Sequence, residues 1–192
     1  MSTTQQSILN KNRKDKFILV LNLPDVLKKI NKLDPADRAS VYLNQDSLQY
    51  SVYGTVVPNI AVPAIDVGFA NQSIPVTSYT RPAYAPVSVN FVVDNWFNNW
   101  WVLWKWIDLI NGAYEGYYNA QNLSDPNSQF TNSYQTTISV FGLDEFNNKK
   151  IEYTYTNAFI TGLEGITYNY QDSDQMSSSF TFSFGQLKSV LL

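Results

Sequence analysis

One segment of this 192-residue chain has helical periodicity, and it lies among several segments that alternate as β-strands do. From Trp96 the apolar side chains recur at steps of four, three, four and three, ending at Ile110, which places them on one face of an α-helix. The other ordered-looking segments alternate with a period of two. Together these patterns predict a mainly β (α+β) fold, a β-barrel or sandwich of about six to eight strands with one amphipathic helix at about residues 95–111.

The predicted strands are short runs separated by turn and proline signals. They cover residues 16–22, 48–57, 87–93, 136–141, 151–156, 166–170 and 180–184. A short helix is expected at residues 25–31, because Pro24 suits a first helical turn, and residues 113–132 are expected to form a loop. Residues 1–15 are polar and predict a flexible N-terminal arm without a secretory signal, so residues 16–192 are expected to form a single domain.

The chain has no Cys and no His, which excludes thiol chemistry, Ser-His dyads and most metal sites. Carboxylates remain as the possible catalytic groups, and glycoside hydrolysis needs two of them flanking the bond. The candidates lie mostly in predicted turns and nothing in the sequence pairs them: Asp144, Glu145, Glu152, Glu164, Asp172 and Asp174. We therefore expect no enzyme, no cofactor and no metal. No apolar stretch is long enough to span a membrane either.

Five tryptophans lie between Trp96 and Trp106. One interpretation is a carbohydrate-binding module, in which indole rings stack on sugars. The helical spacing favours the other, that the helix covers an open face of the sheet. On that interpretation the helix–sheet core comprises Trp96, Trp100, Leu103, Trp104 and Ile107.

Five prolines punctuate residues 58–86, so this stretch is expected to be loop, edge strand or both. It is too long for a simple connector and too apolar to lie free in water, which predicts a subunit interface. Tyr79, Arg81 and Tyr84 are the candidate contact residues, because Tyr and Arg are enriched at interface hot spots. The alternative is that the stretch folds back on its own barrel.

Charge is distributed unevenly along the chain. Residues 1–38 carry eight basic and four acidic side chains, whereas the remainder carries five basic and twelve acidic ones. This asymmetry is compatible with ordinary solubility, and also with self-association between a basic and an acidic surface. An acidic body argues against tight binding of nucleic acid.

Three segments in order resemble the tail-tube proteins of contractile-tailed bacteriophages. The first is the strand at residues 87–93, which runs through Asp94-Asn95 into the aromatic helix containing Trp106-Ile107. The second is residues 155–166 (YTNAFITGLEGI), although Asn157 stands where Gly is common in the family and Ile160 where Pro is common. The third is the closing strand at residues 178–185 (SSFTFSFG). The similarity covers roughly residues 48–187, and the basic segment at residues 11–38 departs from it.

The resemblance implies a structural protein of the virion tail that is assembled in the host cytoplasm. In that family six copies form a ring whose strands join into one inner barrel, and the rings stack into a tube that conducts DNA without binding it specifically. The long loop contacts the adjacent ring, and the partners are further copies, tail sheath and baseplate proteins. Baseplate tube initiators, tube-terminating proteins and type VI secretion tubes share this fold, so these roles stay open as alternatives.

Overall fold

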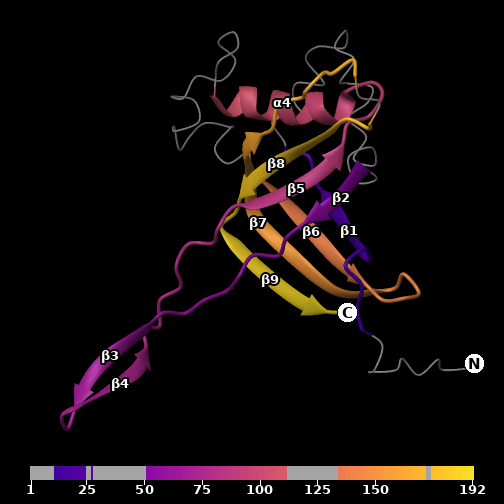
Figure 1. Cartoon of the computed structure of the whole chain (residues 1–192). Helices are drawn as coiled ribbons and strands as arrows, with labels where there is room; N and C mark the ends of the chain where they lie inside the picture. The colour runs from indigo at the N-terminus through magenta and orange to yellow at the C-terminus, as the bar shows by residue number, and fades with distance from the viewer. Residues whose placement is uncertain (1–10, 25–26, 28–50, 112–133, 172–173) are drawn as a thin grey trace, which may run out of the picture.

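The structure is a computed structural model that describes residues 11–24, 27, 51–111, 134–171 and 174–192. Within these ranges it contains nine strands and one helix (Figure 1). The strands are β1 (Phe17–Leu21), β2 (Val52–Thr55), β3 (Ala64–Phe69), β4 (Gln72–Thr77), β5 (Val87–Val92), β6 (Thr136–Leu143), β7 (Lys149–Leu163), β8 (Ser177–Ser183) and β9 (Gln186–Leu191), and the helix is α4 (Asn98–Asn111). The predicted mainly β fold with one helix is confirmed.

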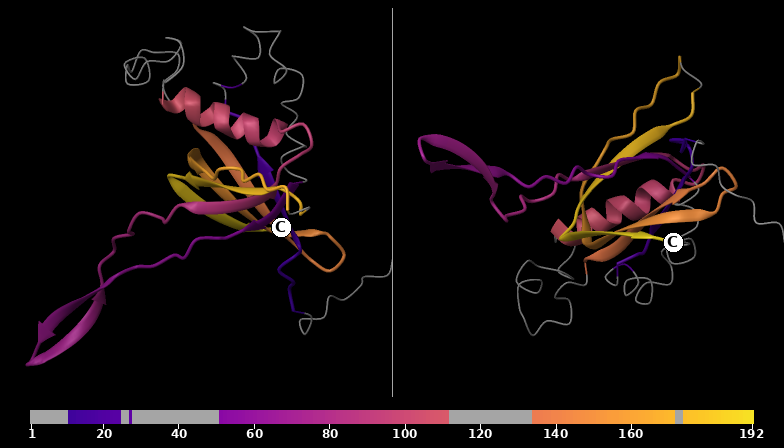
Figure 2. Two further views of the ribbon diagram at one scale, coloured as in Figure 1. Left: turned by 45° about the horizontal axis from the view of Figure 1, so that its top comes forward. Right: turned by 90° about the horizontal axis from the view of Figure 1, so that it is seen from below.

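Seven strands form one curved antiparallel sheet, and α4 lies across it (Figure 2). The strand order is β1-β6-β7-β8-β5-β2, with β9 paired to β7 outside this path. The remaining two strands, β3 and β4, form a separate hairpin that extends away from the sheet (Figure 1).

The 15-residue strand β7 belongs to both halves of the main sheet. Its first half pairs with β9 from Ile151 to Thr156, and its last residues, from Phe159 to Leu163, pair with β8. Between these halves Asn157 has a positive φ of 54°, and the register with β6 shifts by one residue. This is a β-bulge, which bends a strand and increases its twist. Asn tolerates the left-handed conformation better than most residues other than Gly. Asn157 can therefore occupy a position where the tail-tube proteins that this sequence resembles commonly have Gly.

The core lies between α4 and the concave side of the sheet. Alternate residues of each long strand point into it, as the period of two requires. The buried apolar residues include Leu19, Leu21, Val87, Val89, Phe91, Ile138, Val140, Tyr155, Phe180 and Phe182. The Tyr155 ring packs edge-on against Phe182 and Phe184, with centroid distances of 5.3 and 4.9 Å. Aromatic contacts of this geometry stabilise a core beyond the area that they bury.

The helix begins at Asn98, three residues later than the first predicted position, because Asp94 caps it from a distance. The Asp94 carboxylate accepts hydrogen bonds from the backbone N–H groups of Trp96, Asn98 and Asn99. Phe97 takes a positive φ of 59°, which is incompatible with a regular helix. The capping interaction therefore encloses a turn, and the helix starts after it.

The prediction of the helix–sheet core is wrong for two of its five residues, because Trp96 is 73% exposed and Trp104 is 41% exposed. Leu103 is fully buried, and Trp100 and Ile107 are half-buried against the core. The helix is rotated from the predicted face so that the inward residues are Asn99, Val102, Leu103, Trp106 and Leu109.

Asn99 provides the physical reason for this rotation. Its Nδ2 donates to the Val92 carbonyl at 2.8 Å and to Ser51 Oγ at 3.1 Å, and the side chain is 1% exposed. A buried amide that makes these bonds fixes which side of the helix faces the sheet. Apolar residues occupy most of the circumference of α4, so the hydrophobic pattern alone could not select the face.

Several other local predictions need correction. The strand expected at residues 166–170 is absent, and Tyr168 and Tyr170 are exposed. The strand expected at residues 48–57 is described only as β2, with a bulge between Val52 and Gly54. Strand β9 was not predicted.

Of the helix expected at residues 25–31 only Leu27 is described, and it is buried. The expected loop at residues 113–132 lies outside the described residues. The boundary between an arm at residues 1–15 and a domain at 16–192 stays a prediction.

Truncation of Trp106 should destabilise the protein strongly. Its ring is fully buried and its Nε1 donates to the Tyr134 carbonyl at 3.0 Å. We expect Trp106→Ala to lower the free energy of unfolding by about 3–5 kcal/mol. Trp104→Ala, on the exposed side of the same helix, should lower it by less than about 1 kcal/mol. Urea unfolding followed by circular dichroism measures both, and equal losses would contradict the observed rotation of α4.

The buried phenol of Tyr155 should make the fold sensitive to alkaline pH. Burial raises the pKa of this phenol, and its hydroxyl has no hydrogen-bond partner within the described part of the chain. The folded state therefore keeps the proton while the unfolded state loses it above about pH 10, so stability is full below that pH and falls above it. Tyr155→Phe should be neutral or slightly stabilising at about pH 7 and should lose less stability at about pH 11. Urea unfolding at both pH values tests this, and identical pH dependence of variant and parent would refute it.

Candidate assembly interface

Residues 56–86 form an arm that leaves the main sheet after β2 and returns at β5 (Figure 1). Its outer part is the β3–β4 hairpin, closed by a two-residue turn in which Ala70 and Asn71 both have positive φ. Positive φ at both central positions is the mark of a type I′ turn, whose twist matches that of paired strands. Phe69 lies fourteen positions after Thr55, so the arm can reach about 45 Å from the sheet.

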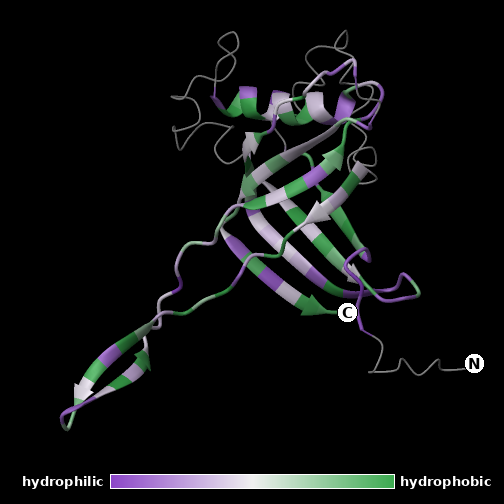
Figure 3. Ribbon diagram, viewed as in Figure 1, coloured by the Kyte–Doolittle hydropathy of each residue, from purple (hydrophilic) through white to green (hydrophobic). Residues whose placement is uncertain are grey.

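The hairpin of the arm has one apolar face and one polar face. The register places Ile65 opposite Val76 and Val67 opposite Ile74, with Phe69 next along the same face. These five side chains are between 42% and 69% exposed. The other face carries Ala64, Asp66, Gly68, Ser73, Pro75 and Thr77. In Figure 3 the hairpin alternates between hydrophobic and hydrophilic residues along each strand.

An isolated two-stranded hairpin is marginally stable in water, and it needs a further surface against its apolar face. Here all twelve residues of β3 and β4 are exposed. Gln72 pairs with Phe69 next to the turn, so its N–H points toward β3, and the N–H groups then alternate between the two edges of β4. Pro75 is three positions further on, so the N–H that it lacks would point to the outer edge. A proline at that place disfavours addition of another strand. The apolar face, rather than the outer edge of β4, is therefore the surface of the arm that is suited to docking.

The root of the arm is attached to the sheet by aromatic contacts. The Tyr84 ring packs on Phe184 at a centroid distance of 4.9 Å. Arg81 Nη1 donates to the Tyr84 hydroxyl at 2.8 Å, and the guanidinium lies 6.0 Å from the same ring. Among the described residues no carboxylate pairs with Arg81.

The structure places the three predicted contact residues in the connecting segment of the arm between β4 and β5, which is not a strand. Tyr79 is 92% exposed with a positive φ, whereas Tyr84 is half-buried and holds Arg81. The alternative in which this stretch folds back on its own barrel is not what the structure shows. The apolar hairpin face was missed by the sequence analysis. Residues 64–69 and 72–77 do alternate with a period of two, but the five prolines around them masked this signal.

Free strand edges are the second feature suited to assembly. Strand β1 pairs only with β6, β9 only with β7, and β2 only with β5, within the described residues. Five of the six residues of β9 are exposed. Unpaired edges of this kind invite a strand from another chain unless something covers them.

The tryptophan cluster does not form a flat platform of the kind that a carbohydrate module uses. Trp106 lies in the core, Trp100 and Trp101 pack partly against it, and Trp96 precedes the helix. Among the described residues no group of acidic side chains is arranged to hold a metal ion. None of the described helical residues belongs to a helix with the length and hydrophobicity needed to cross a bilayer.

Comparison with known proteins gives a consistent result. Residues 12–188 match the family described as phage tail tube protein. A chain of the sheath–tube complex of an extracellular contractile injection system, PVC, in its extended state has a TM-score of 0.57 and 11% identity, covering 100% of this chain and 99% of that one. The tube-terminating cap of the anti-feeding prophage has a TM-score of 0.59 and 13% identity, with 100% of each chain covered.

The PVC sheath/tube terminator in its extended state gives a TM-score of 0.53 and 9% identity, covering 96% of this chain and 99% of that one. No curated protein sequence matches significantly. These structural likenesses, at such low identity, establish the fold, and the family match spans nearly the whole chain. The chain belongs to the phage tail tube protein family, and it is a structural tail tube protein.

Proposed function

We propose that copies of this chain associate side by side into rings of six and that the rings stack into a tube through which DNA passes. The observation that carries this proposal is the exposed arm, whose apolar hairpin face has no partner among the described residues. Apolar surface is covered in a stable protein, and a neighbouring copy supplies the cover in a closed, repeating assembly. The edges of β1, β2 and β9, which have no second strand beside them in the described part of the chain, join neighbouring sheets within a ring in the same way.

The face of β7 and β9 that points away from the core supports passage of DNA without specific binding. It carries Glu152, Thr154, Thr156, Gln186 and Lys188 together with Val190, so it is mostly polar and close to neutral. The Glu152 carboxylate accepts hydrogen bonds from Ser139 Oγ and Thr154 Oγ1 at 3.1 and 3.3 Å. A wall with few cations does not hold phosphates, because tight binding requires clustered Lys and Arg.

In this proposal the role is structural and involves no catalysis. The tube is assembled in the host cytoplasm as part of the virion tail, inside a sheath and on a baseplate. A tube-terminating protein of the same fold is the second candidate, favoured by the likeness to a terminating cap and a terminator. A chain with an exposed docking arm is suited to repeated stacking, which favours the trunk of the tube.

Negative-stain electron microscopy of the purified protein with an arm variant tests the proposal. The parent should give stacked rings, isolated rings would favour an initiator or a terminator, and monomers alone would contradict the proposal. Val67→Asp places a charge on the apolar hairpin face and should abolish stacking. The matched control is Gly68→Asp, on the opposite face, where an added Cβ meets nothing within 4 Å. Equal effects of the two variants would exclude the apolar face as the docking surface.

Arg81 is expected to contact an acidic part of a neighbouring copy. Arg81→Glu should then weaken assembly by placing like charges together, while Arg81→Lys, which keeps the charge, should assemble nearly as the parent does. Tyr79→Ala and Tyr84→Ala together should weaken it as well. Sedimentation measures assembly, with circular dichroism as the folding control. Normal assembly of a well-folded Arg81→Glu protein would remove this residue from the interface.

A further inference from the structure

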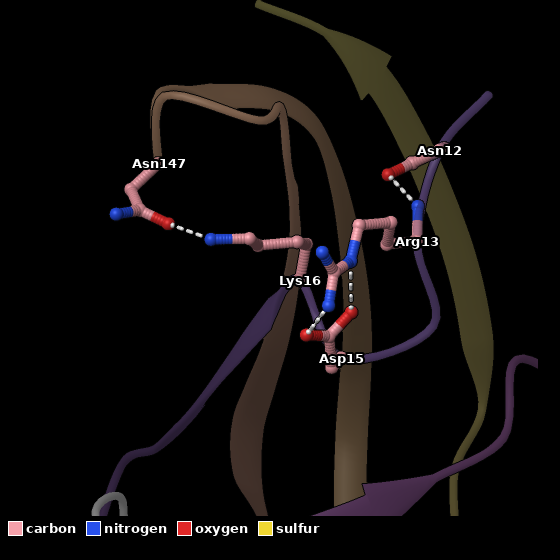
Figure 4. Close-up of polar contacts among 5 residues, drawn as sticks. All are labelled: Asn12, Arg13, Asp15, Lys16 and Asn147. Carbon is pink, nitrogen blue, oxygen red and sulfur yellow. Dashed lines mark hydrogen bonds and ion pairs between the residues drawn. The ribbon is translucent and has the colours of Figure 1, made fainter. Parts of the chain in front are cut away.

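A cationic surface lies at the end of the main sheet where β6 turns into β7. The segment before β1 runs beside this turn, because Lys16 Nζ donates to Asn147 Oδ1 at 2.7 Å (Figure 4). The Leu143 N–H also donates to the Lys16 carbonyl at 3.0 Å. We name this surface, residues 11–16 and 144–150, the basic rim. It contains six cations, Lys11, Arg13, Lys14, Lys16, Lys149 and Lys150, and three carboxylates, Asp15, Asp144 and Glu145.

Internal ion pairs leave part of this charge available. Arg13 donates two hydrogen bonds to the Asp15 carboxylate (Figure 4), and these bonds lower the pKa of that carboxyl. A second ion pair joins Lys150 Nζ to Asp144 Oδ2 at 3.7 Å. Lys11 and Lys14 are exposed and have no ion pair with any described residue. At the tip of the turn the Phe146 side chain is 57% exposed. The basic rim therefore offers positive charge around an apolar ring.

The opposite end of β7 leads into a surface of the opposite charge. We name residues 164–171 and 174–175 the acidic loop. The carboxylates of Glu164 and Asp174 lie there, and residues 151–187 contain no Lys or Arg. Tyr168 and Tyr170 are largely exposed in the same loop. Because β7 has 15 residues, the path along the strand from one surface to the other is about 45–50 Å, and the bend at Asn157 brings the ends closer than that.

We propose that the basic rim of one copy docks on the acidic loop of a second copy in the next ring, and that this contact sets the polarity of stacking. The proposal rests on the proposed stacking of rings. Charge complementarity selects the partner, and exposed aromatic rings on both sides, Phe146 facing Tyr168 and Tyr170, supply apolar area. The two surfaces differ and lie at opposite ends of one strand, so the contact is head-to-tail and repeats without limit.

DNA is the competing occupant of a cationic surface. The basic rim has a net charge of only +3 from six cations and three carboxylates, and an exposed phenylalanine occupies the tip of the turn. Tight binding to phosphates needs many unpaired cations on one surface. The composition of the rim therefore favours a protein partner.

Charge reversal on each surface, alone and combined, tests the proposal. Lys11→Glu with Lys14→Glu should place like charges together and lower the sedimented fraction about tenfold or more, and Glu164→Lys with Asp174→Lys should do the same. Combining all four substitutions makes the rim acidic and the loop basic, so stacking should return. Asp66→Lys, on the exposed polar face of the hairpin, is the control for a change of charge elsewhere. Stacking of the parent should also weaken between about 0.05 and 0.5 M salt.

Electron microscopy separates the failure of this inference from the failure of the proposed function. A parent that forms no stacked rings under any salt condition overturns both. A parent that stacks, with reversal variants that stack equally well, overturns the inference alone. The inference alone is also overturned if the variant with all four substitutions is folded by circular dichroism and yet forms no stacked rings. A rim variant that loses retention on immobilised DNA while its tubes are unchanged would assign the rim to nucleic acid instead.

Discussion

Every strand of the main sheet takes its position, directly or through one neighbour or two, from β7. Strands β6, β8 and β9 pair with it, and β1, β5 and β2 follow from these. One strand can serve both halves only because it bends, and the bend is placed at Asn157, where the partner changes from β9 to β8. The interior follows from the same bend, since Tyr155 just before it and Ile160 just after it both point into the core beneath α4. A local backbone choice at one residue thus defines the curvature on which helix packing depends.

The surfaces that the monomer leaves open give the fold its functional character. A protein of this size can bury its own core, and the central part does so around Trp106 and Phe180. The arm and the strand edges do not, and they lie at the periphery (Figure 1). Apolar side chains concentrated in an extended hairpin contribute nothing to the stability of a lone chain. They become favourable only against a second surface, so stability of the complete protein is linked to its assembly.

Some of this could be predicted from the sequence, and the reasons for the rest are physical. The existence of α4 followed from its period of 3.6 residues, and the buried strands followed from theirs. The rotation of α4 depends on hydrogen bonds from Asn99 to residues outside the helix, which no local pattern encodes. Residues 166–170 alternate convincingly, yet β8 already pairs with β7 and β5, so no edge remains for them there. Strand β9 is mostly exposed and is defined by its pairing with β7 rather than by hydrophobicity. For the arm, the prolines predicted where it lies, but they concealed the alternation that gives it an apolar face.

Those prolines have a consequence for the thermodynamics of assembly. Pro58, Pro63, Pro82 and Pro86 flank the hairpin, and each fixes its own φ and restricts the residue before it. A stem with these restrictions has fewer conformations to lose when the hairpin docks, and ordering a backbone residue otherwise costs about 1–2 kcal/mol. The free chain therefore loses less conformational entropy when subunits join, because its prolines already restrict the stem. Replacing these four prolines by glycine would leave the apolar face of the hairpin unchanged and still weaken the assembly.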